Sequence, residues 1–254
     1  MINRLRFKEK SILLGITLLF SVVAVAQQWK PAGKKIKTSW AEKIDVNNVL
    51  GEYPRPIMVR KEWKNLNGLW DYSIQKKGGE APKKGDGKIL VPFAVESSLS
   101  GVMKEVGAEN ELWYNKTFTI PDNWDGSNIL LHFGAVDWKS DIWLNGVKIG
   151  SHTGGYTPFS FDITPFLSSG EQKLTVKVWD PTSDGPQPRG KQVKNPDGIW
   201  YTPVTGIWQT VWLEPVAEKS IKNLKITPDI DNSAIKIKPL LTNASYGDII
   251  EVTI

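Results

Sequence analysis

One irregular stretch of the chain, from Asp180 to Pro203, gathers the residue types that protein surfaces use to hold sugars. An aromatic ring can stack on the C–H face of a pyranose, while carboxylate, amide and guanidinium groups hydrogen-bond its hydroxyls. The same residue types also build ordinary solvated loops, so composition alone leaves both interpretations open. The candidate substrate-binding residues in this stretch are Asp180, Asp184, Arg189, Gln192, Asp197, Trp200 and Tyr201.

A catalytic set is not visible in the sequence. Hydrolysis of a glycosidic bond usually needs two carboxyl groups about 5 to 9 Å apart, one of them with a raised pKa. None of the acids is placed in an apolar environment that would mark a proton donor. Glu96 comes nearest, and we interpret it as a turn carboxylate that accepts backbone N–H groups. We therefore predict no catalytic residue in this chain.

Metal and triad chemistry would have to involve His132 or His152, because the chain has two histidines and no cysteine. Neither histidine has a partner at the spacing of a zinc site, and the sequence contains no nucleophilic serine motif or phosphate-binding loop. We predict neither a metal nor another cofactor. Without cysteine the fold has no disulfides and must be held by its apolar core.

The segments around these residues have the period-two hydrophobicity of β-strands. Apolar and polar side chains alternate in segments such as 129–133 and 174–179, and Asn145-Gly146 is typical of a type I′ hairpin turn. Turn residues recur at short intervals, and no window of helical length has an apolar stripe. We predict that residues 50–217 form an all-β jelly-roll sandwich, in which 180–203 is the one long loop.

Twelve tryptophans are an unusual number for a chain of 254 residues. Trp138, Trp200 and Trp208 lie beside predicted turns or in the long loop, where a core would not place them. The tryptophans inside predicted strands are instead interpreted as core or interface residues, and these are Trp70, Trp143, Trp179 and Trp212.

The first 26 residues have the three parts of a secretory signal peptide, namely basic residues, an apolar run and an A-x-A cleavage site. The apolar run of about 14 residues is too short to span a bilayer. We therefore expect a periplasmic or secreted product with no membrane partner after signal removal. Four basic residues and one acid in this segment account for +3 of the formal charge of +5, so nucleic acid is not indicated as a partner. Residues 27–49, with a cluster of lysines, are interpreted as a solvated, flexible arm.

The sequence changes character after the predicted sandwich. Three apolar runs, at 221–226, 234–240 and 249–254, are predicted to be strands. Three strands do not close a sandwich of their own. We interpret residues 218–254 as the truncated opening of an immunoglobulin-like domain.

Six stretches of the predicted sandwich together resemble the N-terminal sugar-binding domain of glycoside hydrolase family 2, which includes β-galactosidases, β-glucuronidases and β-mannosidases. They occur in the order typical of the family, and they are Val91-Pro-Phe-Ala-Val-Glu-Ser97, Leu112-Trp-Tyr-Asn-Lys-Thr-Phe-Thr-Ile-Pro121, Leu131-His-Phe-Gly-Ala-Val-Asp-Trp138, Ile142-Trp-Leu-Asn-Gly146, His152-Thr-Gly-Gly-Tyr-Thr-Pro-Phe159 and Trp200-Tyr-Thr-Pro-Val-Thr-Gly-Ile-Trp-Gln209.

This resemblance implies a jelly-roll domain, an immunoglobulin-like domain and then a (β/α)₈ barrel that carries two catalytic glutamates. The chain would be the non-catalytic N-terminal part of an exported enzyme that hydrolyses O-glycosidic bonds, with carbohydrate and the missing barrel as its partners. In galactosidase and glucuronidase members a sugar-binding acid lies six positions before the glycine that matches Gly206. Here Trp200 occupies that position and the nearest acid is Asp197, so their specificity is not carried over. Two alternatives stay open, a stand-alone carbohydrate-binding module and a purely structural sandwich.

Overall fold

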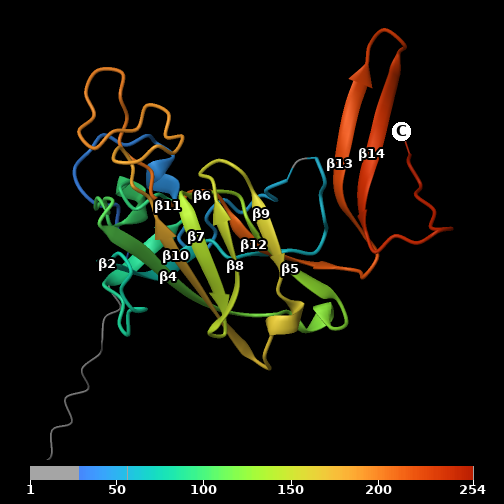
Figure 1. The fold of residues 1–254 in the computed structure, drawn as a ribbon, viewed down its shortest axis with the longest axis horizontal. Coiled ribbons are helices and arrows are strands. Elements are labelled where there is room, and N and C mark those ends of the chain that lie inside the picture. The colour runs from blue at the N-terminus through green and yellow to red at the C-terminus, as the bar shows by residue number, and fades with distance from the viewer. Residues whose placement is uncertain (1–28, 56, 254) are drawn as a thin grey trace, which may run out of the picture.

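The computed structural model describes residues 29–55 and 57–253, and the predicted signal peptide lies outside that range. Strands make up most of the regular structure (Figure 1). The helices in the described part are four 3₁₀ turns, at Ala41–Lys43, Ser98–Ser100, Asp122–Trp124 and Thr164–Phe166. Over the same residues, no helix combines the length and the apolar character that crossing a bilayer requires.

The larger of the two main sheets has six antiparallel strands in the order β3-β2-β4-β10-β7-β8. Its strands are β2 (Gly68–Lys76), β3 (Gly87–Val91), β4 (Asn110–Thr119), β7 (Lys139–Leu144), β8 (Val147–Thr153) and β10 (Glu171–Trp179). The predicted turn residues Asn145 and Gly146 connect β7 to β8 with φ angles of 51° and 83°, the two positive values that a type I′ turn needs. This hairpin prediction is confirmed.

The smaller sheet has the order β1-β12-β5-β9 and is also antiparallel. Its strands are β1 (Lys64–Asn65), β5 (Asn128–Phe133), β9 (Phe159–Asp162) and β12 (Val211–Val216). The chain passes repeatedly from one sheet to the other, as in a jelly roll, and the two sheets enclose a single apolar core. The predicted all-β sandwich is confirmed.

Alternation along the strands decides which side chains enter this core. In β10, Leu174, Val176 and Val178 are fully buried, whereas Thr175 and Lys177 point away from the core. Burial of an aliphatic side chain contributes about 1.5 to 3 kcal/mol, so this alternation fixes the register of each strand.

Of the four strand tryptophans predicted to be core or interface residues, Trp70 packs in the core, whereas Trp143 and Trp179 do not. Trp143 and Trp179 are half-buried on the outer face of the larger sheet, where Lys177 and Lys77 respectively lie against their indole rings. Trp179 follows Thr175 and Lys177 on the outward-facing side of β10. Trp143 lies directly opposite Thr175 on the neighbouring strand β7, and so faces the same way. Strand periodicity predicts that one face is buried, but only the packing of the sheets shows which one.

A two-stranded ribbon closes the end of the sandwich that carries the long loop. It pairs β6 (Val136–Asp137) with β11 (Gly206–Ile207), and Gly206 lies opposite Asp137. The Ile207 backbone N–H donates to the buried Tyr114 hydroxyl at 3.2 Å. The ribbon therefore ties the end of the loop to the core.

The N-terminal arm packs on the sandwich over part of its length. Its lysines are exposed, as predicted. Ala41 and Val49, however, are buried, and the Ala32 N–H donates to the Ser98 carbonyl at 2.8 Å. The arm is therefore attached to the sandwich at these contacts, because its small apolar side chains gain more free energy from burial than from exposure to water.

Beyond the sandwich, β13 (Ser220–Asp229) and β14 (Ala234–Thr242) form a hairpin that projects away from both sheets (Figure 1). These two strands are confirmed, but residues 249–253 are not a strand. A strand needs a neighbour to accept its backbone hydrogen bonds, and no described segment pairs with this one. The immunoglobulin-like domain stays a prediction.

Candidate functional site

The predicted sugar-binding residues lie on an irregular loop between β10 and β11, at the end of the sandwich opposite the projecting hairpin (Figure 1). The loop folds back on itself through backbone hydrogen bonds from Tyr201 N–H to the Lys191 carbonyl, 2.9 Å, and from Val193 N–H to the Tyr201 carbonyl, 3.0 Å. The absence of regular structure in this stretch was predicted. Its internal hydrogen bonds hold the loop in one conformation on the surface.

Three of the seven predicted residues hold the loop in place. Asp180 is buried and accepts hydrogen bonds from the Thr182 N–H, 2.8 Å, and the Thr205 hydroxyl, 3.1 Å. Arg189 donates to the carbonyls of Ser183 and Gly185 at 3.0 and 3.3 Å. The polar groups of these two side chains form hydrogen bonds within the loop and to Thr205 at its end.

Gln192 braces the loop against the body of the domain. Its Oε1 accepts from the Val204 N–H at 2.6 Å, and its Nε2 donates to the Tyr156 hydroxyl at 3.2 Å. With Asp180 and Arg189, it makes the base of the loop a hydrogen-bonded scaffold.

The other four predicted residues face solvent. Trp200 and Tyr201 are 46% and 63% exposed, and Asp184 and Asp197 are also exposed. The Trp200 N–H donates to the Asp197 carbonyl at 3.1 Å, which places this acid one turn from the indole ring. An anchored loop with exposed aromatic rings and a nearby carboxylate is suited to stacking on a sugar, and that role stays a prediction.

A cluster of buried acids under the loop was not predicted. Glu96, Asp137 and Asp180 are each less than a tenth exposed, and Thr205 joins two of them by donating its N–H to Glu96 at 2.9 Å and its hydroxyl to Asp180. Among the described residues none of the three forms a salt bridge, and Glu96 Oε1 has no hydrogen-bond partner. The expectation that no acid lies in an apolar environment is therefore wrong, although Glu96 does accept a backbone N–H as predicted.

The environment of this cluster favours uncharged carboxyl groups. Burial raises the pKa of Glu96 to about 7, against hydrogen bonds from Thr205 that act in the opposite direction. Burial and the charge of Asp180 raise the pKa of Asp137 to about 7 as well, and burial raises that of Asp180. Sequence spacing could not reveal this, because the three acids come from three segments that meet only in the fold.

The acid cluster makes stability depend on pH. Because the folded-state pKa of Glu96 is above its usual 4.5, the stabilisation by its neutral form is complete below about pH 4.5 and is lost as the pH rises through about 7. We expect Glu96→Gln to be more stable than the wild type at pH 8 by about 2 kcal/mol, with no such gain at pH 4.5. Urea unfolding at the two pH values measures this.

The control for this prediction is Glu80→Gln, which replaces an exposed acid. This variant should keep the wild-type difference between the two pH values. If Glu96→Gln also kept that difference, Glu96 would not be the group that titrates.

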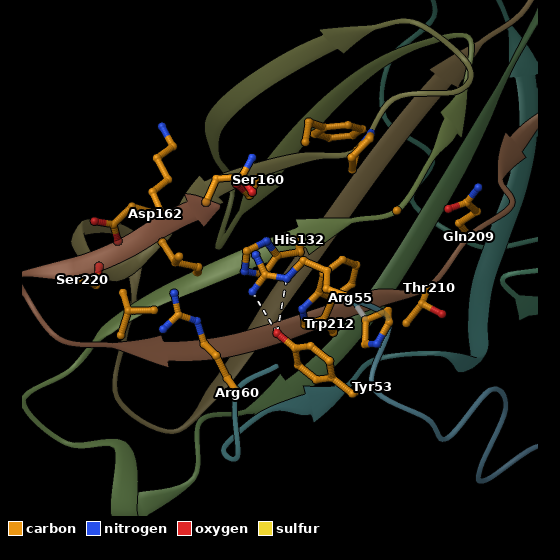
Figure 2. Close-up of a pocket in the computed structure, with 18 of the residues that line it drawn as sticks. Tyr53, Arg55, Arg60, His132, Ser160, Asp162, Gln209, Thr210, Trp212 and Ser220 are labelled. Carbon is orange, nitrogen blue, oxygen red and sulfur yellow. Dashed lines mark hydrogen bonds between the residues drawn. The ribbon is translucent and has the colours of Figure 1, made fainter. Parts of the chain in front are cut away.

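A second polar network lies on the outer face of the smaller sheet, at the floor of a groove of about 920 Å³ (Figure 2). Its centre is Glu214 of β12, whose side chain is fully buried. Oxygen Oε1 accepts from Trp212 Nε1 at 3.2 Å and from the Tyr53 hydroxyl, and Oε2 accepts from Arg60 Nε at 3.2 Å and from Arg55 Nη2. The carboxylate thus binds donors from the strand beneath it and from the segment above it.

His132 completes this network from the neighbouring strand β5. Its ring stacks on Trp212 with a centroid separation of 4.7 Å, and its Nε2 lies 3.2 Å from Glu214 Oε2. Burial lowers the pKa of His132, against the influence of Glu214, so the imidazole is neutral at pH 7. Spacing along the sequence indicates no partner for His132, because Glu214 lies on the neighbouring strand β12. Over residues 29–55 and 57–253, no group of acids and histidines has the arrangement of a metal site.

Comparison with known proteins shows the family to which the central part of the chain belongs. Residues 91–215, from the end of β3 to near the end of β12, match the family model described as the sugar-binding domain of glycosyl hydrolases family 2. Residues 91–215 form a family 2 sugar-binding domain. The resemblance found in the sequence motifs is thereby confirmed.

Similar proteins contain this domain within a longer chain. A β-glucuronidase of Paenibacillus borealis is 25% identical over 201 residues, which are 72% of this chain and 34% of the relative. A β-galactosidase of Thermoanaerobacter pseudethanolicus is 32% identical over 168 residues, 65% of this chain and 21% of the relative. The chain spans about a third or less of the length of these relatives.

Solved structures support the fold. The structure of a β-glucuronidase from an uncultured Clostridium sp. aligns with a TM-score of 0.57 and 22% identity, over 74% of this chain and 35% of that chain. At this identity the likeness is one of fold. It agrees with the sandwich described above.

Proposed function

We propose that this chain is the non-catalytic N-terminal part of an exported glycoside hydrolase that cleaves O-glycosidic bonds, and that its loop 180–203 forms one wall of the substrate site. A catalytic (β/α)₈ barrel in the same enzyme would supply the acid and the nucleophile. The loop would contact sugar through Trp200 and Tyr201, with Asp184 and Asp197 accepting hydrogen bonds from hydroxyl groups.

One observation carries this proposal, namely that the family 2 domain holds two exposed aromatic rings on a loop anchored from below. Exposed aromatic side chains on an unanchored loop would lose conformational entropy on binding, whereas a braced loop has already lost it. Asp180, Arg189 and Gln192 supply the bracing. The relatives named β-glucuronidase and β-galactosidase agree with a glycoside as the substrate.

The proposal predicts that the loop tip contributes to sugar affinity. Tyr201→Ala and Trp200→Ala should each weaken binding of an oligosaccharide or aryl β-glycoside by about tenfold, because one stacking contact is worth on the order of 1 to 2 kcal/mol. Neither change should lower the melting temperature, since both side chains lie at the surface and neither belongs to the core. Isothermal titration calorimetry with galactosides, glucuronides and mannosides measures the affinity.

The matched control is Tyr246→Ala, which removes a fully exposed tyrosine near the C-terminal end. It should leave sugar binding unchanged. Binding by the wild-type chain alone, lost in the loop variants, would favour a stand-alone carbohydrate-binding module. If the wild type bound none of the sugars, the loop would act only together with a barrel, or the sandwich would be structural. Hydrolysis of an aryl β-glycoside by this chain would contradict the assignment of catalysis to a barrel.

A further inference from the structure

The groove on the outer face of the smaller sheet is separate from the loop tip. It is bounded by residues 50–55 and Arg60, by strands β5, β9 and β12, by residues 208–210 and by the base of the β13-β14 hairpin. Figure 2 shows Tyr53, Arg55, His132 and Trp212 gathered at its centre, with Ser160 and Asp162 of β9 on one side. Its volume of about 920 Å³ lies in the range of small-molecule sites, which runs from about 300 to 1,000 Å³.

The floor of the groove has an excess of positive charge. Arg55 and Arg60 both bind the single carboxylate of Glu214, and the neighbouring His132 is neutral at pH 7. Two guanidinium groups against one carboxylate give these three side chains a net charge of +1. In a partly buried site this charge attracts a further anion more strongly than it would in open solvent.

Each guanidinium group also has a hydrogen-bond donor that is not used within the described part of the chain. Arg55 uses Nε and Nη2 on Tyr53 and Glu214, and Arg60 uses Nε on Glu214 and Nη2 on the Ile221 carbonyl. The Nη1 atoms of both arginines have no partner among the described residues. The two side chains are 27% and 22% exposed, so a ligand can reach them. Guanidinium N–H groups pair preferentially with carboxylates.

An aromatic wall lies at the edge of the groove. Tyr156, which is 51% exposed, packs edge-on against Trp208 at 6.1 Å between ring centroids. The Tyr156 hydroxyl accepts from Gln192 and the Trp208 Nε1 donates to the Gly155 carbonyl at 2.7 Å, so both rings are held in place. A fixed, exposed ring of this kind offers a stacking surface for a pyranose.

Charges on the rim limit what the groove can accept. Lys222 lies there together with two acids, Glu52 and Asp162. A ligand densely covered with negative charge would meet these acids. A polar ligand with a single carboxylate would meet less repulsion from them than a polyanion would.

We propose that this groove binds an oligosaccharide that contains a uronic acid residue, with the uronate carboxylate on Arg55 and Arg60 and a neighbouring sugar ring on Tyr156. The hydroxyl groups of Ser160 and Thr210 and the amide of Gln209 line the same groove and can bond sugar hydroxyls. The inference rests on the proposed function in that it takes carbohydrate as the ligand. It uses none of the loop-tip residues.

The experiment compares trigalacturonate with its fully methyl-esterified form, which has the same backbone and no charge, by calorimetry on the full chain at pH 7. The acid should bind at least about tenfold more tightly than the ester, the value of one charge-assisted hydrogen-bonded pair. Ser160→Trp, which fills the groove from an exposed position on β9, should abolish binding of both. Arg60→Gln should remove the preference for the acid, with folding checked by thermal melting.

The proposal would be overturned by equal affinity for acid and ester, by no binding of either, by full binding to Ser160→Trp, or by equally tight binding of a hexaglutamate peptide. Trp200→Ala separates this inference from the proposed function. If it abolished trigalacturonate binding, the ligand would sit on the loop, so the groove proposal would fail and the loop proposal would stand. If it weakened only neutral-sugar binding, both proposals would gain support.

Discussion

Replacing Glu214 with alanine should lower the free energy of unfolding by about 3 kcal/mol, the low end of the range for removing one partner of a buried ion pair. The carboxylate is fully buried and accepts from Tyr53, Arg55, Arg60 and Trp212. Its removal would leave two guanidinium groups side by side without a counter-charge. Because both arginines are partly exposed, water would recover some of the loss.

The stabilisation by Glu214 should disappear in acid. Burial would raise its pKa, but the contacts with His132, Tyr53 and Arg55 outweigh burial and hold the pKa at about 2. Because this value is below the usual 4.5, the stabilisation is present above about pH 4.5 and is lost as the pH falls toward 2. Urea unfolding of the wild type and Glu214→Ala should therefore differ at pH 7 and converge near pH 2.

Glu218→Ala is the control, since it removes an exposed glutamate a few positions away. Its free energy of unfolding should stay within about 0.5 kcal/mol of the wild type. A loss for Glu214→Ala no larger than this would mean that the arginines are solvated well enough to stand alone. The charge balance at the groove floor would then need another explanation.

Replacing Gly206 with alanine should also destabilise the protein by about 3 kcal/mol, because a positive φ and a steric clash act together. Gly206 has a φ of 94°, and a Cβ atom there would lie 2.0 Å from the Tyr114 hydroxyl oxygen. Tyr114 is fully buried and cannot move away without disturbing the core. Thermal and urea unfolding measure the loss.

Gly170→Ala separates the two contributions. Gly170 has a φ of 79°, and an added Cβ there would meet no atom within 4 Å. Its substitution should cost only the strain of the backbone, about 1 kcal/mol. Equal losses at positions 170 and 206 would show that the Tyr114 contact relaxes freely.

The Gly206 position also matters for the loop. Thr205, its neighbour, donates to Glu96 and Asp180, and Gly206 itself pairs with Asp137. A shift of the backbone at 206 would move all three acids and the base of the loop. We therefore expect Gly206→Ala to weaken any sugar binding by the loop, whereas Gly170→Ala should not.

The sequence by itself determined the class of fold, several of the strands and the location of the loop. Period-two alternation identified β5 and β10, because a strand that buries one face requires it. Asn145-Gly146 identified its hairpin, because positive φ angles suit few other residues. Six motifs identified the family 2 domain, which the family model confirms over residues 91–215. Each of these patterns involves residues that are close together in the sequence or that repeat along it. They can therefore be recognised without knowledge of the fold.

Only the tertiary structure decided which polar residues are buried in networks and which are exposed to solvent. The sequence grouped Asp180 with Trp200 as sugar-binding residues, but the fold buries the first and exposes the second. Tyr53 and Glu214, 161 positions apart, meet because the segment before β1 covers the outer face of β12. Glu96 and Asp137 acquire raised pKa values from a low-dielectric environment that several segments build together. Burial and long-range contact depend on how the sheets and loops pack, and spacing along the chain carries no measure of either.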